Sequence, residues 1–115
     1  MALLLVGCGD AASPYRSVLR DQAAAFEDLE RVLGTVTDEA SMKAARAELA
    51  KSWKQCEAIK ERALELAPPS FTVRDEVHSE TLRLNQAFER MQRQMSRIKA
   101  LPGGEQFLKS LALDT

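Results

Sequence analysis

The chain is poor in the residues from which most active sites are built. Its 115 residues include one histidine, His78, and two cysteines, Cys8 and Cys56. A single histidine excludes a histidine pair, the HExxH motif and a Ser-His-Asp arrangement built on a second base. The two cysteines are too far apart for a CxxC redox or zinc motif, and no CxxCH haem motif is present. We therefore expect no catalytic residue, no metal site and no cofactor, in a protein that is not an enzyme.

An excess of charge of one sign is also missing, and aromatic residues are few. The chain carries 16 basic and 17 acidic residues, a formal net charge of −1, and only 5% aromatics. Nucleic acid is therefore not an expected partner, because nothing provides a basic surface interleaved with aromatic rings for base stacking. Gly103-Gly104 is not followed by the Lys and Ser/Thr of a phosphate-binding loop. No segment alternates with a period of two, so strands are not expected.

What remains is rich in alanine, leucine, glutamate and arginine, the composition of long helices. Apolar residues recur at spacings of three and four within segments that turn signals separate. Ser13-Pro14 is typical of an N-cap followed by proline in the first turn, and Gly34 of a helix end. Pro68-Pro69 must end the second helix, because a helix interior does not tolerate proline. We predict helices over residues 14–35, 38–67, 72–101 and 104–112, the third opening at Thr72 with Asp75 as a capping partner.

Short connections between long helices force antiparallel neighbours. The sequence therefore predicts an all-α fold, an antiparallel up-down-up three-helix bundle with a short C-terminal helix, as one domain over residues 14–115. Trp53 is expected to be half-buried and its replacement to cost less than that of Phe88. Cys56 is expected to pack as a small apolar residue, with a Cys8–Cys56 disulfide as the alternative if Cys8 is not acylated. The expected core consists of Leu29, Leu49, Ile59, Leu84, Phe88 and Ile98.

The run Leu5-Val6-Gly7-Cys8 resembles the lipobox of bacterial lipoproteins. This resemblance implies cleavage before Cys8, lipidation of its thiol, and a mature chain attached to a membrane at the cell envelope. Residues 1–7 would then be a truncated signal peptide and residues 8–13 a tether. The alternative is a cytoplasmic chain with an apolar start, because residues 1–7 lack the basic n-region of a secretory signal. The start is too short for a transmembrane helix, which needs about 20 apolar residues.

Three further motifs, Asp38-Glu39-Ala40-Ser41, Pro68-Pro69-Ser70 and Pro102-Gly103-Gly104, look like those of small exported helical proteins of uncharacterised function. That resemblance implies an exported helical domain and supplies no activity or site residue.

Two surfaces are candidates for a partner. The first predicted helix is shorter than the other two, which should leave apolar side chains under-covered at the Pro68-Pro69 end, where a second copy or an envelope protein could bind. These residues are Leu64, Leu66, Phe71, Val73 and Val77. The other surface is a stripe that either complements the end of the third helix or binds an anionic partner. It consists of Arg83, Arg90, Arg93 and Arg97.

The sequence thus favours a non-enzymatic, membrane-anchored envelope lipoprotein that acts as a helical interaction or scaffold module. One alternative is a helical-bundle binder of haem, a metal ion or a small apolar molecule. Another is a cytoplasmic helical adaptor.

Overall fold

The computed structural model describes residues 11–113 of the chain and the side chains of residues 11–111. The predicted all-α fold is confirmed: the described part contains helices and turns and no strand. The predicted signal peptide and Cys8 lie outside the described residues. The helices are α2 (Ser13–Leu33), α3 (Glu39–Leu64), α4 (Phe71–Glu76), α5 (His78–Lys99) and α6 (Gly104–Leu113).

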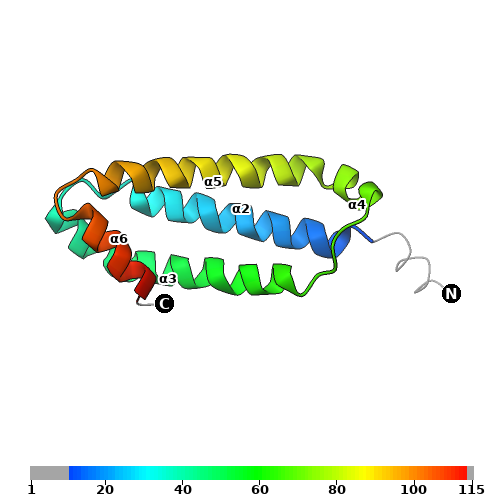
Figure 1. Cartoon of the computed structure of the whole chain (residues 1–115), viewed down its shortest axis with the longest axis horizontal. Helices are drawn as coiled ribbons and strands as arrows, with labels where there is room; N and C mark the ends of the chain where they lie inside the picture. The colour runs from blue at the N-terminus through cyan, green and yellow to red at the C-terminus, as the bar shows by residue number, and fades with distance from the viewer. Residues whose placement is uncertain (1–10, 114–115) are drawn as a thin grey trace.

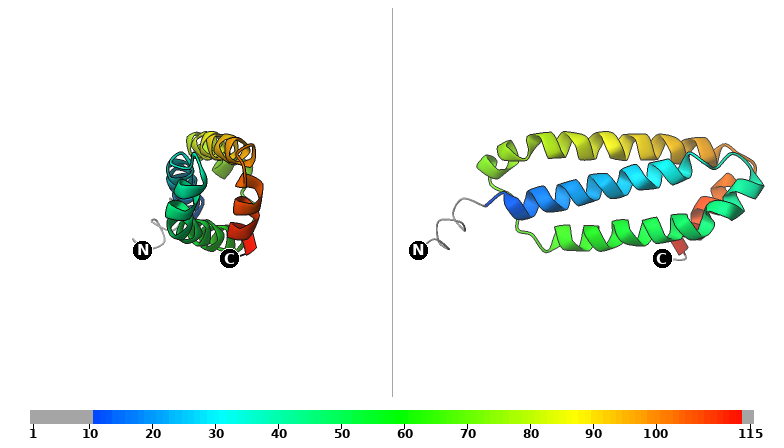
Figure 2. Two further views of the ribbon diagram at one scale, coloured as in Figure 1. Left: turned by 90° about the vertical axis from the view of Figure 1, so that its left-hand side faces the viewer. Right: turned by 180° about the vertical axis from the view of Figure 1, so that it is seen from behind.

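Helix α2 lies in the middle of the molecule, antiparallel to both α3 and α5 (Figure 1). It packs along both of these helices, whereas α3 and α5 do not pack closely against each other. Helix α6 contacts α3 and α5 on the side away from α2. Seen down the long axis, α2, α3, α5 and α6 therefore form the four sides of a square (Figure 2). Because α6 is short, this square exists at one end of the molecule only.

Capping residues explain where two of the helices begin. The Asp38 carboxylate accepts a hydrogen bond from the Ser41 N–H (2.9 Å) and the Ser41 hydroxyl accepts one from the Asp38 N–H (2.9 Å), a capping box that opens α3 where predicted. The start predicted at Thr72 is wrong by one residue. Ser70 is the N-cap, its hydroxyl accepting from the Val73 N–H at 3.2 Å, so α4 starts at Phe71.

The long third helix predicted over residues 72–101 is broken at Val77, which has φ −101° and ψ 16°. The break separates α4 from α5, and both Val73 and Val77 pack against Ala12 at the start of α2. The expected shortfall of the first helix is accordingly wrong with respect to the third, since α2 has 21 residues and α5 has 22.

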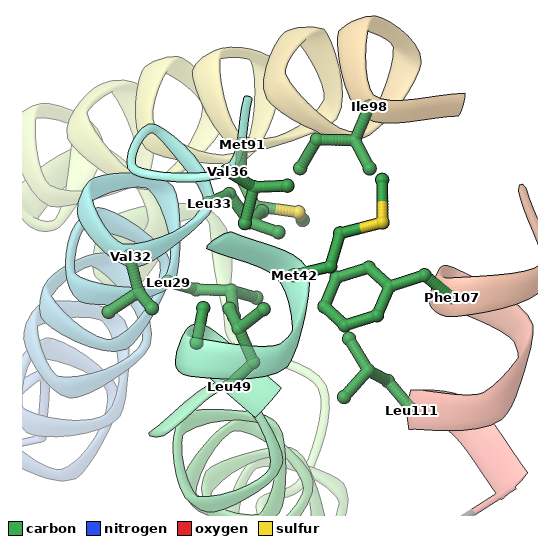
Figure 3. Close-up of a cluster of buried hydrophobic side chains, with 11 residues drawn as sticks. Leu29, Val32, Leu33, Val36, Met42, Leu49, Met91, Ile98, Phe107 and Leu111 are labelled. Atoms are coloured by element: carbon green, nitrogen blue, oxygen red, sulfur yellow. The ribbon is translucent and has the colours of Figure 1, made fainter. Parts of the chain in front are cut away.

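The main core lies at the end of the molecule that α6 covers (Figure 3). Of the predicted core residues, Leu29, Leu49 and Ile98 are confirmed, with exposed fractions of 2%, 1% and 0%. The prediction is wrong for the others, all of which lie beyond the reach of α6. Ile59 and Leu84 are half-buried. The remaining core side chains of this end are Val32, Leu33, Val36, Met42, Ala45, Met91, Phe107 and Leu111.

Two rings also depart from their predicted ranking. Phe88, expected to be in the core, is 39% exposed and packs against the ring of Phe26, with centroids 5.3 Å apart. Trp53 is half-buried as predicted, and it packs against the main core. The expectation that replacing Trp53 would cost less than replacing Phe88 is therefore not supported by their packing.

A tight turn brings α6 back onto the bundle. Gly103 has φ +76°, and a Cβ on Gly104 would lie 1.7 Å from the Ile98 carbonyl oxygen. Once placed, α6 is held by Arg46 of α3, which donates to the Ser110 hydroxyl (2.6 Å) and lies over the Phe107 ring, 5.6 Å from its centroid. Both glycines are needed for the chain to turn this sharply and seat α6 between α3 and α5.

Candidate interaction surface

An open apolar groove occupies the Pro68-Pro69 end of the molecule, opposite the end that α6 covers. We call it the end groove. Its volume is about 550 Å³, and it lies between the start of α2, the end of α3 and the α4–α5 junction. Its lining residues are Tyr15, Val18, Leu19, Gln22, Ala63, Leu64, Leu66, Ala67, Pro68, Pro69, Arg74, Val77, His78 and Thr81.

Two of the five apolar residues predicted to be under-covered at this end are exposed, and the other three are partly or fully buried. Leu64 is 75% exposed and Phe71 is 88% exposed, as expected of an under-covered end. Leu66 is half-buried. The expectation is wrong for Val73 and Val77, which are 7% and 4% exposed, because both pack against Ala12 at the start of α2.

Hydrogen bonds and ion pairs from α2 fix the walls of the end groove. The Tyr15 hydroxyl donates to the Ala67 carbonyl at 2.7 Å, which ties the segment after α3 to the start of α2. Arg16 donates to the Glu76 carbonyl at 3.4 Å and lies 3.5 Å from the Glu80 carboxylate. Arg20 reaches the same carboxylate oxygen at 3.7 Å. These contacts tie α2 to the segment after α3 and to the α4–α5 junction, and the apolar groove lies between these three parts.

Sequence reasoning missed the contribution of α2 to this surface. Tyr15 and Leu19, four residues apart, belong to the apolar stripe of the first helix. They lie on the wall of a groove because none of the described helices covers this end, which periodicity along one helix does not reveal. The available signal was the length of the last predicted helix, which is too short to cover the whole bundle.

Hollows of about 600 and 320 Å³ lie where α6 meets α3 and α5. Nearer the centre of the molecule, beneath α6, there is a small apolar cavity of about 70 Å³. Its lining residues are Leu29, Leu33, Leu49, Trp53, Met95, Leu108 and Leu111. This cavity is far smaller than the end groove, about 70 against 550 Å³.

The arginines of the stripe mainly make contacts with other residues of the same chain. Arg83 donates to both carboxylate oxygens of Glu27, at 2.6 and 3.2 Å, and this pairing lowers the pKa of Glu27. Arg90 donates to Glu30 at 3.2 Å. Arg97 donates to the carbonyls of Val36 and Leu33, at 2.7 and 2.9 Å, and so satisfies the C-terminal end of α2.

Only Arg93 points mainly into solvent, with a side chain 77% exposed and a long contact of 3.9 Å to Glu89. The stripe therefore joins α5 to α2, and three of its four arginines are not the free anion-binding groups that the sequence suggested.

The two side chains best suited to catalysis or metal binding, those of His78 and Cys56, do not belong to a cluster of such groups within the described residues. His78 lies exposed on the rim of the end groove. Residues 11–111 contain no cluster of three or more His, Cys, Asp or Glu side chains that could hold a metal ion. Cys56 packs against the core, and burial raises the pKa of its thiol to about 11, which disfavours the reactive thiolate. The proposed Cys8–Cys56 disulfide involves a residue outside the described range.

No helix within the described range is long and apolar enough to span a bilayer. Comparisons with protein-family models, curated proteins and solved structures found no match to this chain.

Proposed function

We propose that this chain is a non-enzymatic interaction module of the bacterial envelope, anchored through Cys8, with the end groove as its docking surface. The observation that carries the docking role is the groove itself, a hollow of about 550 Å³ bordered by the exposed side chain of Leu64. An apolar surface of this kind is unfavourable in water and is more often an interaction site than bare surface.

The anchoring role rests on the Leu5-Val6-Gly7-Cys8 run and on its position in the chain. Three residues separate Cys8 from Ala12, which is 3% exposed and packs against Val73 and Val77. The tether thus enters the domain beside the end groove. A lipid on Cys8 would hold the groove within a few residues' reach of the membrane surface, about 3.3 Å for each extended residue.

A membrane-partition experiment tests the anchor. The gene is expressed with its native upstream region as wild type, as Cys8→Ser and as Cys56→Ser, the last a matched control because its thiol is packed in the fold. Wild type and Cys56→Ser are expected in the detergent phase, with a mass that includes acyl chains, and Cys8→Ser in the aqueous phase. Wild-type protein that stays aqueous and keeps residues 1–7 would overturn the anchor and favour the cytoplasmic adaptor.

The shape of the end groove also favours a second candidate, a binder of a small apolar molecule. Its volume of about 550 Å³ is in the range of small-molecule pockets, about 300–1,000 Å³. An apolar ligand extracted with the purified protein and identified by mass spectrometry would support this function over protein docking. For haem or a metal ion the groove offers His78 as its one imidazole.

A further inference from the structure

We infer that the end groove is filled by a second copy of this chain, in a two-fold symmetric dimer in which Phe71 of each copy enters the groove of the other. This inference takes from the proposed function only the use of the groove as a docking surface. It does not depend on lipidation of Cys8.

Phe71 is the projecting part of this interface. It is the first residue of α4 and is 88% exposed, the highest value among the exposed large apolar side chains of the described residues. Its ring is contacted on one side by the guanidinium of Arg74, 5.5 Å from the ring centroid. Folding of the single chain therefore leaves nearly all of this ring in water. A large aromatic side chain in that position is typical of the anchor residues at the centre of protein interfaces.

The matching hollow lies directly beside it. Pro69 and Arg74 line the end groove, and they lie two residues before and three residues after Phe71. A two-fold dimer requires each copy to offer the same projection and the same hollow within one patch, so that both contacts form at once. A projection far from its hollow would instead link copies into an open chain. The closeness of Phe71 to the end groove thus points to a closed pair.

Charges around the patch agree with this pairing. In this dimer we place the neighbouring Arg74 against the wall of the partner's groove that the end of α3 forms. That wall presents Leu64 and, next to it, Glu65, an exposed carboxylate with no ion pair among the described residues. Arg74 is exposed as well. The symmetric contact brings each Arg74 toward the partner's Glu65, so opposite charges surround the apolar centre.

Sedimentation of the full chain tests the dimer. All variants carry Cys8→Ser so that no lipid contributes, and circular dichroism verifies their helix content. The parent chain is expected to show a concentration-dependent monomer–dimer equilibrium. Phe71→Glu should raise the dimer dissociation constant by at least about 30-fold, the effect of losing a central anchor. Leu82→Glu is the matched control, because Leu82 is 47% exposed on α5 but does not line the groove. It should change the constant less than about threefold.

A charge-reversal cycle adds a signature that general surface damage would not give. Glu65→Arg and Arg74→Glu should each weaken the dimer, and the double variant should recover most of the parent affinity. A chain that stays monomeric at all concentrations overturns the inference, and protection of groove amides from hydrogen exchange in that monomer would assign the groove to residues 1–10. A dimer that tolerates Phe71→Glu also overturns it. Failure here leaves the Cys8 partition result unaffected, so the two proposals stand or fall separately.

Discussion

The two ends of this molecule share the long helices α2, α3 and α5 and differ in how these helices are covered. At one end α6 covers the space between α3 and α5, and the side chains of Leu49 and Ile98 are 1% and 0% exposed. At the other end none of the described helices lies in that position, and Leu64 and Phe71 are 75% and 88% exposed. The ten residues of α6 cover the main core at one end, whereas the other end carries the end groove.

This comparison shows that an apolar stripe does not by itself define a core. The stripes of α2 and α5 run the full length of the bundle, and both contribute to the core and to the end groove. A stripe forms core where another element covers it, and it lines the open end groove where none of the described elements does. Tyr15 and Arg16 of α2 make hydrogen bonds to the other walls of the groove, so specific polar contacts also fix the arrangement of the open end. The exposed apolar surface is therefore compatible with a well-defined fold.

The largest expected effect on stability comes from truncating one side chain beneath α6 and comparing it with one beyond the reach of α6. Ile98→Ala at the covered end removes a fully buried side chain and should lower the free energy of unfolding by about 2–5 kcal/mol. Phe88→Ala, in the middle of α5 and beyond the reach of α6, should cost about 1–2 kcal/mol, although phenylalanine is larger, because its ring is 39% exposed. Urea denaturation of the two variants and the parent measures both values.

A matched control is Leu82→Ala, which removes an exposed leucine from α5 and should stay within about 0.5 kcal/mol of the parent. If Phe88→Ala proves as destabilising as Ile98→Ala, the ring of Phe88 is covered in solution, and its contrast with the core beneath α6 disappears.

The fold was largely predictable because its signals are local. Proline pairs, capping residues and spacings of three and four are properties of short segments, and they gave the helices and their antiparallel order. The break at Val77 was not predictable in the same way. No proline or glycine marks it, and the residues before and at the break, Val73 and Val77, pack against Ala12 at the start of α2, a contact between distant parts of the sequence. The sequence pattern alone continues smoothly through this position.

The candidate site was predictable only as a location. Counting apolar residues against helix lengths placed an under-covered surface at the Pro68-Pro69 end. Which side chains are exposed depends on the break at Val77 and on the short reach of α6, so Val73 was assigned to the surface and Phe88 to the core, both wrongly. The arginine stripe shows the same limit. One helix reveals the spacing of Arg83 and Arg90, but their partner Glu27 lies on another helix.

The next largest effect tests whether α6 makes the difference between the ends. Gly104→Ala places a Cβ 1.7 Å from the Ile98 carbonyl oxygen, so the turn must shift and α6 must move from its position against α3 and α5. We expect a loss of about 1–3 kcal/mol, the usual cost of overpacking, with faster hydrogen exchange around Phe107 and Leu111.

Gly34→Ala is the control, because Gly34 has φ −61° and its Cβ would be 3.3 Å from the nearest atom, a carbonyl oxygen. It should change stability by less than about 1 kcal/mol. Exchange rates around α6 that are equal in the parent and in Gly104→Ala would show that the close approach does not hold this helix in place.

The smallest effect concerns Cys56, which packs against the covered core and serves as a probe of it. Burial raises its thiol pKa to about 11, so at pH 8 the thiolate fraction is roughly 200-fold below that of a free thiol of pKa about 8.5. The greater nucleophilicity of a more basic thiolate recovers about tenfold, which leaves alkylation roughly 20-fold slower than in the unfolded chain. In the Cys8→Ser background, the folded-state rate should keep rising through pH 10, where a free thiol has already levelled off. Alkylation of the folded chain at the unfolded rate, with a plateau near pH 9, would mean that Cys56 lies in solvent and that the covered end is shorter than the structure indicates.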